Sequence, residues 1–547
     1  MNQAAAEAAA DPVVPPELVD PKTPKEVKIR LSARPPVTDP TLGIEVSVDG
    51  SKAKHRLVSI GDSLTHGFQS LAIFNTDLSY PALIARELGW YENFLHPEYP
   101  GYGGLPLDLE FVLHQLEGQY GSEINFWEIA PAFFFIRHLL NEIELYWEQG
   151  DGSKFPPAVG INHNLGIYGW DLRDILCKTA ASEKAVLDQL LAGGPTTIGL
   201  IPIGVGAKVK RYMEICGRMA AVRVLESAHA PDGTAFTPLE AAKALGDDGG
   251  IETLTVFIGA NNALGTVLEL GEPRWSGEFY DDCVKKDAYN VWLPSHFEAE
   301  YRLITEAIGA IKASHVIFCT VPHVTIVPIA RGVGTVKTRP GSRYFDYYTH
   351  VWITDDDFDP VRDPYLTGNQ ARAIDSAIDQ YNDLIVDIVR EGRQAGKDWL
   401  VLDTAGILDR MAYRRYLSDP TAQPAWWTPY PLPPALAALN PPPDSRFFAS
   451  DPAGRSQGGL IALDGVHPTT AAYGILAQEL IQVMQAAGVT FNNADGTPRL
   501  GRVNLDFKWL LTRDTLLLDP PISLTPDLKA LGWLNEMVDL AKRLAWH

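Results

Sequence analysis

The 547-residue chain lacks the long apolar segments that mark a membrane protein. No stretch of about eighteen apolar residues occurs, and we therefore expect no transmembrane helix. The N-terminus has no positively charged start followed by an apolar segment. We therefore expect no cleaved signal peptide and a cytoplasmic protein.

Cysteine is scarce and scattered. The four cysteines are Cys177, Cys216, Cys283 and Cys319, and no Cys-x-x-Cys pair occurs among them. This spacing predicts reduced thiols in the core of a cytoplasmic protein, and not a disulfide framework. It also disfavours a zinc site, and we expect no metal and no cofactor.

Positive charge is in deficit, because 46 Lys and Arg face 68 Asp and Glu, which gives a formal net charge of −22. Such an acidic chain is not expected to bind nucleic acid or anionic lipid surfaces. The acidic cluster Asp355-Asp356-Asp357-Phe358-Asp359 lacks the spacing of a known calcium loop, so we favour an exposed loop over a cation site there.

The most informative segment that is present is Leu57–His66, LVSIGDSLTH. Its apolar start predicts a buried strand of a parallel sheet, and the residues after Gly61 predict a turn into a helix. Ser63 would then lie at the carboxyl edge of the sheet and at a helix N-terminus, where negative charge is stabilised. The alternative is an ordinary turn in which the serine caps the helix.

Four short blocks occur in an order that resembles the SGNH, or GDSL, hydrolase superfamily of esterases and lipases. They are Gly61–Gly67 (GDSLTHG), Asn164–Gly169 (NLGIYG), Ile258–Asn262 (IGANN) and Leu463–Pro468 (LDGVHP). One departure from the family pattern is Asn262, where many members carry Asp. We expect this change to affect local loop structure and not the chemistry.

The fourth block contains the one histidine of thirteen that has an aspartate three residues before it, His467 after Asp464. Pro468 and the apolar-periodic residues that follow predict that His467 lies where a loop enters a helix. The alternative is a loop histidine that is merely hydrogen-bonded to its own aspartate.

The resemblance implies a role for each residue. Ser63 is the nucleophile, His467 the general base and Asp464 the group that orients the imidazole. The oxyanion donors implied are the backbone N–H groups of Ser63 and Gly169 and the side-chain amide of Asn261. Gly166 competes with Gly169 for the same role, and we favour Gly169.

The alternation of strand-like and helical segments predicts an α/β fold with a central parallel sheet. The five expected strands are Arg56–Ile60, Ala158–Asn162, Leu254–Ile258, His315–Cys319 and Trp399–Leu402. Helices are expected at Tyr80–Leu88 and Gln370–Glu391. By resemblance, the architecture is a three-layer α/β/α sandwich with flavodoxin-like strand order.

The chain is much longer than the family core of about 200 residues, an ordinary single-domain size. We expect a disordered tail at residues 1–27, the hydrolase domain at 28–500 and a C-terminal extension at 501–547 with helical periodicity in Pro526–Trp546. Insertions are expected at about 90–155, 200–250, 320–365 and 410–455.

Two apolar segments inside the insertions could shape a substrate pocket. Ile129–Trp147 predicts an amphipathic helix, for which we favour a buried core helix over a lid or acyl-chain wall. Trp426-Trp427 and the proline-rich Tyr430–Pro443 predict a rigid extended loop, which either lines a pocket or packs on the surface.

The function expected from these residues is serine-dependent hydrolysis of carboxylic esters through an acyl-enzyme, with a small-molecule or lipid-like ester as substrate. The alternatives are an acyltransferase that uses the same triad, a carbohydrate O-acetylesterase, or a non-catalytic binding protein on the same fold. Association into a homo-oligomer through the insertions or the C-terminal extension is left open.

Overall fold

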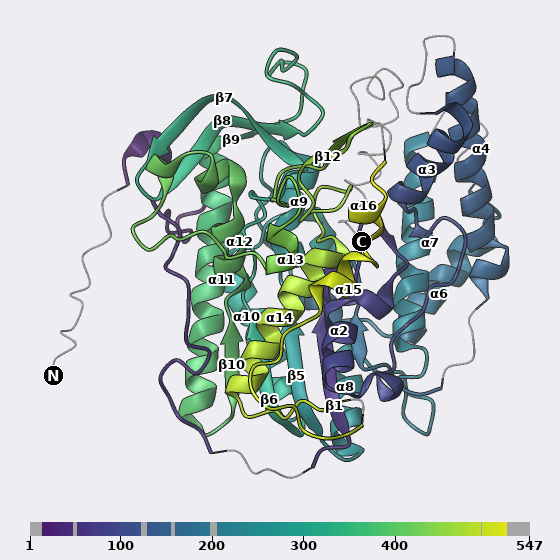
Figure 1. Cartoon of the computed structure of the whole chain (residues 1–547), viewed down its shortest axis with the longest axis vertical. Helices are drawn as coiled ribbons and strands as arrows, with labels where there is room; N and C mark the ends of the chain where they lie inside the picture. Colours follow the sequence, from purple (N-terminus) through teal and green to yellow (C-terminus); the bar gives the residue numbers. More distant parts are fainter. Residues whose placement is uncertain are drawn as a thin grey trace.

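The computed structural model describes residues 14–47, 52–121, 128–154, 159–196, 205–493 and 495–521. Its centre is a five-stranded parallel sheet in the order β10-β6-β5-β1-β4 (Figure 1). The strands are β1 (His55–Gly61), β4 (Asn164–Gly166), β5 (Ile251–Phe257), β6 (Ala313–Cys319) and β10 (Trp399–Leu402). If the five strands are numbered 1 to 5 along the chain and read from the β4 edge, their order is 2-1-3-4-5. The winding of the chain therefore reverses between β1 and β5.

Four of the five expected strands are confirmed, and the strand expected at Ala158–Asn162 is wrong over residues 159–162, the part that the structure describes. Val159 is 92% exposed, and the third parallel partner lies later, at β4, where Gly166 pairs with Gly61 of β1. The prediction relied on apolar composition, whereas β4 is a short strand whose Gly166 allows close packing against the helix that follows β1.

Alternate side chains of the strands point to opposite faces of the sheet and enter two separate cores. Val58, Val256 and Phe318 belong to one core, whereas Leu57, Phe257 and Ile317 belong to the other. This period-two pattern explains why the central strands read as continuous apolar runs, since both faces are covered.

Helices cover both faces of the sheet. One face carries α2 (Tyr80–Glu87), α12 (Thr404–Met411), α13 (Pro434–Ala437), α14 (Thr470–Ala486) and α15 (Phe507–Leu511). The other carries α5 (Leu172–Cys177), α8 (Pro238–Asp247), α9 (Asn261–Glu269), α10 (Pro294–Gly309) and α11 (Gly368–Gln394). The helices expected at Tyr80–Leu88 and Gln370–Glu391 are confirmed as α2 and α11.

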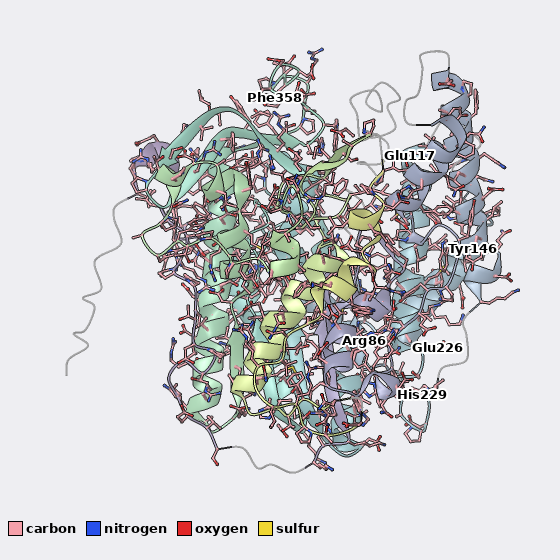
Figure 2. All side chains as sticks on the ribbon, viewed as in Figure 1. Arg86, Glu117, Tyr146, Glu226, His229 and Phe358 are labelled. Atoms are coloured by element: carbon pink, nitrogen blue, oxygen red, sulfur yellow. A yellow bond between two sulfur atoms is a disulfide. The ribbon has the colours of Figure 1, made fainter. Side chains whose placement is uncertain are left out.

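A third core lies beside the β4 edge, on the right in Figure 1, among four helices. They are α3 (Leu109–Tyr120), α4 (Ile129–Glu148), α6 (Ala180–Ala192) and α7 (Val205–Leu225). The helix expected at Ile129–Trp147 is α4, and it buries Ile136, Ile143 and Trp147 in this cluster while Phe134 is 68% exposed. Figure 2 shows the side chains of Glu117 and Tyr146 on this helical part.

Smaller elements complete the structure. Antiparallel strands are β7 (Ala330–Arg339), β8 (Ser342–His350) and β9 (Leu366–Thr367), β2 (Ala72–Ile73) with β3 (Leu105–Pro106), and β11 (Ala449–Asp451) with β12 (Gly454–Gln457). Single-turn helices include α1 (Ser63–His66) and α16 (Thr515–Leu518). Tight 3-10 turns lie at Pro16–Leu18, Thr76–Leu78, Tyr91–Asn93, Asp151–Ser153, Lys285–Ala288 and Pro420–Ala422, and a wider π-helical turn lies at Tyr413–Leu417.

The expectation of a disordered tail at residues 1–27 needs correction for residues 14–27, which pack on the molecule and bury Leu18 and Val27. These two apolar side chains supply the burial, which a segment rich in Ala and Pro with interspersed acidic residues did not lead us to expect. Residues 1–13 and the helix expected at Pro526–Trp546 lie outside the described residues. No helix in the described part of the chain is long and apolar enough to cross a membrane.

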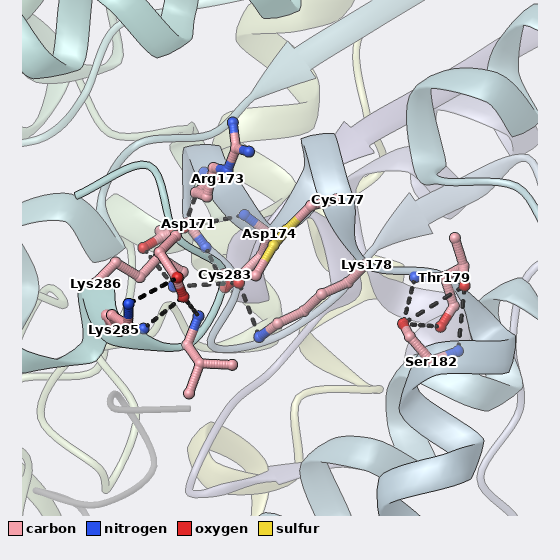
Figure 3. The surroundings of a disulfide bond; sticks show 12 residues. Asp171, Arg173, Asp174, Cys177, Lys178, Thr179, Ser182, Cys283, Lys285 and Lys286 are labelled. Carbon is pink, nitrogen blue, oxygen red and sulfur yellow. Dashed lines mark hydrogen bonds and ion pairs between the residues drawn. A yellow bond between two sulfur atoms is a disulfide. The ribbon is translucent and has the colours of Figure 1, made fainter. Parts of the chain in front are cut away.

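A disulfide joins Cys177, the last residue of α5, to Cys283, with Cα atoms 6.7 Å apart (Figure 3). The loop that carries Cys283 is held against α5 by Lys286, whose Nζ lies 2.8 Å from Asp171 and 3.1 Å from Asp174. Burial would lower the pKa of Lys286, but the two carboxylates outweigh it and raise that pKa.

The prediction of four reduced thiols is therefore wrong for Cys177 and Cys283, although Cys216 and Cys319 are free and buried. Sequence spacing could not pair two cysteines 106 residues apart, because only the fold brings their loop and helix together. Reduced thiols were one of the arguments for a cytoplasmic location, and the disulfide removes that argument.

Candidate active site

Ser63 is the first residue of α1, two residues after β1 ends at Gly61. Asp62 caps the helix by accepting the Leu64 N–H at 3.0 Å. A Cβ atom on Gly61 would approach Oγ1 of Thr65 to 2.1 Å and the Phe257 carbonyl to 2.4 Å. Glycine is thus required at position 61 for the helix to start this close to the sheet.

The structure brings the three predicted catalytic side chains together. His467 Nε2 lies 2.9 Å from Ser63 Oγ, and His467 Nδ1 lies 2.9 Å from Oδ2 of Asp464. His467 precedes α14, as the apolar periodicity predicted. A serine hydroxyl, an imidazole and a carboxylate in this order form the hydrogen-bonded chain that activates a serine.

Asp464 is buried and fully engaged as an acceptor. Its Oδ1 accepts the backbone N–H groups of Val466 and His467 at 2.9 and 2.8 Å, and its Oδ2 also accepts that of Leu71 at 3.1 Å. Burial alone would raise the pKa of Asp464, but the imidazole of His467 and these hydrogen bonds lower it below its ordinary value. The carboxylate is therefore held ionised.

Asp62 has the opposite electrostatic character. Burial raises its pKa to about 7, and the Leu64 N–H and His467 offset that rise only in part. Its Oδ2 has no hydrogen-bond partner among the described residues. A second carboxyl group, neutral over much of the acidic range, thus lies next to the serine.

The three predicted oxyanion donors also meet. Ser63, Gly169, Asn261 and His467 all line one small pocket. Asn261 Nδ2 donates one hydrogen bond to the Trp170 carbonyl at 2.7 Å and has a second N–H to offer. In the part of the chain that the structure describes, no acceptor is found for the backbone N–H of Ser63 or of Gly169.

Gly169 and its competitor Gly166 have different positions. Gly166 lies within β4, and a Cβ there would approach the backbone N of His66 to 2.6 Å. Its N–H already donates to the Asn164 side chain. Gly169 has a φ of 79°, in the left-handed region, and lines the small pocket.

A second, larger pocket also borders Ser63 and His467, with a volume of about 140 Å³. Engineered apolar cavities of about this volume stay dry and hold a benzene-sized ligand. Most of its lining is apolar: Leu64, Phe257, Ala260, Leu264, Pro322, Val324, Val327, Ile407, Leu408, Met411, Leu460, Ile461, Val466, Pro468, Ala472, Ile475 and Leu476. We call it the apolar pocket.

His323 is the one ring-nitrogen side chain besides His467 at the apolar pocket. Its Nδ1 contacts Asp409 at 2.9 Å and its Nε2 contacts Asp379 at 3.2 Å. Burial would lower the pKa of His323, but the two carboxylates raise it well above its usual value. Both ring nitrogens are occupied, so this charged side chain does not make the pocket polar.

Two of the segments singled out in the sequence lie elsewhere. Trp427 donates its indole N–H to the Asp409 carbonyl and is buried in the loop packing, and neither Trp426 nor Trp427 lines the two pockets. In the acidic cluster, Asp355 pairs with Arg331 and Asp359 with Arg362. No group of three or more potential metal ligands occurs among the described residues.

Sequence reasoning missed the contribution of the segment after α1. Ser70 and Leu71 have φ values of 49° and 65°, which non-glycine residues rarely adopt. This backbone aims the Leu71 N–H at Asp464. No motif or periodicity signals it, because the contact is made by backbone conformation.

No family model, curated protein or solved structure matched the chain. The arrangement of Ser63, His467, Asp464 and the neighbouring donors is therefore interpreted from its own geometry.

Proposed function

We propose that this protein is a serine hydrolase of carboxylic esters with an SGNH-type site, and that it acts through an acyl-enzyme on Ser63. The observation that carries the proposal is the continuous hydrogen-bonded chain from Ser63 through His467 to Asp464 beside unpaired N–H donors. A flavodoxin-like fold is part of the proposal, and the strand order 2-1-3-4-5 supports it. In such sheets, ligands bind where the winding reverses, which here is between β1 and β5.

The reaction begins when His467 Nε2 accepts the Ser63 hydroxyl proton as Oγ attacks the ester carbonyl carbon. Asp464 keeps the imidazole oriented, with Nδ1–H toward the carboxylate, and stabilises the imidazolium. His467 then donates the proton to the departing alcohol, which leaves the acyl group on Ser63. Water, activated by His467 in the same way, releases the acid.

The tetrahedral intermediate carries its negative charge on the former carbonyl oxygen. The N–H groups of Ser63 and Gly169 and the amide of Asn261 are the donors that we assign to it. Removal of one such donor typically costs about 10²–10³ in turnover.

The apolar pocket favours esters with an apolar acyl or aryl group over acetylated sugars. A sugar would need several hydrogen-bonding partners, because a buried hydroxyl without one costs about 1–3 kcal/mol. The pocket offers few, since the ring nitrogens of His323 are already occupied. The volume of about 140 Å³ suits a group close to benzene in size.

The test is hydrolysis of p-nitrophenyl esters from acetate to palmitate by wild type, Ser63→Ala and the exposed control Ser418→Ala. We expect an optimum at short to medium acyl or aryl groups and a loss on the order of 10⁶ in turnover for Ser63→Ala. Ser418→Ala should behave as wild type. Wild-type activity that survives in Ser63→Ala would contradict the proposal.

Product analysis with an added alcohol distinguishes hydrolysis from acyl transfer. Hydrolysis predicts free acid as the main product at moderate alcohol concentration. A new ester as the main product would show that the same acyl-enzyme serves a transferase.

A further inference from the structure

The segment that carries Gly169, residues 167–170, is fixed at both ends, and we call it the oxyanion strap. The N–H of its first residue donates to the carbonyl of Gly61 at 3.1 Å. The carbonyl of its last residue accepts from Nδ2 of Asn261 at 2.7 Å. Between these two points, one side chain among the described residues accepts a hydrogen bond from the strap's backbone, and it comes from the helix that begins with Ser63.

That side chain is His66, the last residue of α1. Its Nδ1 faces the backbone N–H of Tyr168 at 3.3 Å, and its Nε2 lies 2.9 Å from the hydroxyl of Tyr99. The Tyr99 hydroxyl donates in turn to the Ala220 carbonyl at 3.2 Å. All four residues are buried.

The donors in this chain determine where the imidazole proton lies. A backbone N–H can only donate, so Nδ1 of His66 must be the unprotonated acceptor. Nε2 then carries the proton and donates it to Tyr99, whose own proton is committed to Ala220. Burial lowers the pKa of His66 to about 3, which keeps the ring neutral as this pattern requires.

We propose that His66 is a positioning residue for the oxyanion hole, because its Nδ1 fixes the peptide N–H of Tyr168 and thereby the orientation of the next N–H, that of Gly169. This role rests on the proposed function. It links the nucleophile and an oxyanion donor through one short helix, since Ser63 begins α1 and His66 ends it. The sequence places His66 inside the GDSLTHG block, where it has the appearance of a spacer.

Two substitutions separate hydrogen bonding from packing. Asn at position 66 can present a side-chain oxygen near the location of Nδ1 and keep the bond from Tyr168. Gln instead places its terminal amide near the location of Nε2, so it keeps the contact with Tyr99 and loses the bond from Tyr168. Asn is smaller than Gln, so a role in packing alone predicts that Asn is the worse replacement.

We expect His66→Gln to lower kcat by about 10²-fold with KM within about threefold of wild type, because misplacement of a group by about 1 Å costs that much. His66→Asn should retain at least about ten times the kcat of His66→Gln. The affinity for an alkyl trifluoromethyl ketone, which forms a tetrahedral adduct, should follow kcat across the three proteins. A smaller ratio between the two variants, or a change confined to KM, would overturn the role.

A second test reads the protonation state of His66 in the wild-type protein itself. Nitrogen-15 NMR of labelled histidines, with His66 assigned by its loss in His66→Asn, should report a neutral ring protonated on Nε2 from about pH 5 to pH 9. An imidazolium, or a ring protonated on Nδ1, would overturn the proposal. Absence of Ser63-dependent turnover in wild type would remove the proposed function and this role together, whereas a failed Asn–Gln contrast in an active enzyme removes the role alone.

Discussion

At the scale of single residues, the site depends on which atom donates each proton. Asp464 receives three backbone N–H groups and one imidazole N–H, so only an anion satisfies all four. The lowered pKa of Asp464 has this physical origin, despite the burial that opposes it.

Asp464→Asn should lower kcat by about 10⁴-fold with little change in fold, because an amide favours the wrong imidazole tautomer. Steady-state kinetics with the best p-nitrophenyl ester measure this loss. The exposed change Asp357→Asn is the control and should leave kcat unchanged. A loss of less than about tenfold for Asp464→Asn would show that another group orients His467.

Asp62 permits a prediction about pH and stability. Its pKa is raised to about 7 in the folded protein from an ordinary value of 3.8. The neutral acid therefore stabilises the folded state fully below about pH 4, and this contribution is lost as the pH rises toward 7. Asp62→Asn, which stays neutral, does not lose it.

The difference in unfolding free energy between Asp62→Asn and wild type should therefore shift in favour of the variant between pH 4 and pH 7. The slope should be on the order of 1 kcal/mol per pH unit. Urea denaturation at several pH values measures it, and other titrating groups cancel in the difference. A difference that is independent of pH would mean that Asp62 ionises normally.

At the scale of elements, α1 lies so close to β1 and β4 that two glycines are required. Gly61 and Gly166 are paired in the sheet, and a Cβ on either would meet Thr65 at less than 3 Å. Most strands could be predicted because their apolar runs are covered on both faces. β4 could not be predicted, since it is short and its place in the sheet depends on the close contact between Gly166 and α1.

Gly166→Ala should destabilise the fold by roughly 1–3 kcal/mol or more, because the new methyl group overlaps backbone that cannot move aside. Gly118→Ala is the matched control: it lies exposed within α3 with open space around its Cα. There alanine should stabilise the helix by about 0.5–1 kcal/mol. Thermal or urea unfolding of both variants checks the opposite signs, and equal effects would contradict the packing argument.

At the scale of the whole molecule, the motif blocks are far apart in the sequence and meet only in the fold. Ser63 and His467 are predictable because each sits in a short motif at the end of an element. The Leu71 contact with Asp464 and the pairing of Cys177 with Cys283 are not, because each depends on a long-range approach of loops.

The disulfide closes a loop of 106 residues, and such a link stabilises a protein by roughly 2–5 kcal/mol. The double variant Cys177→Ser, Cys283→Ser should lose about that much unfolding free energy, and reductant should not destabilise it further. Thiol titration of unreduced, unfolded wild type should count the two thiols of Cys216 and Cys319. A count of four would contradict the bond.

The central claim is that Ser63 carries the acyl group during turnover. The most direct measurement is intact-mass analysis of enzyme quenched in acid during turnover of a p-nitrophenyl ester, followed by peptide mapping. The account predicts one added acyl group on Ser63 in wild type and none in Ser63→Ala. An acyl adduct on a residue other than Ser63, or wild-type turnover that survives in Ser63→Ala, would contradict it.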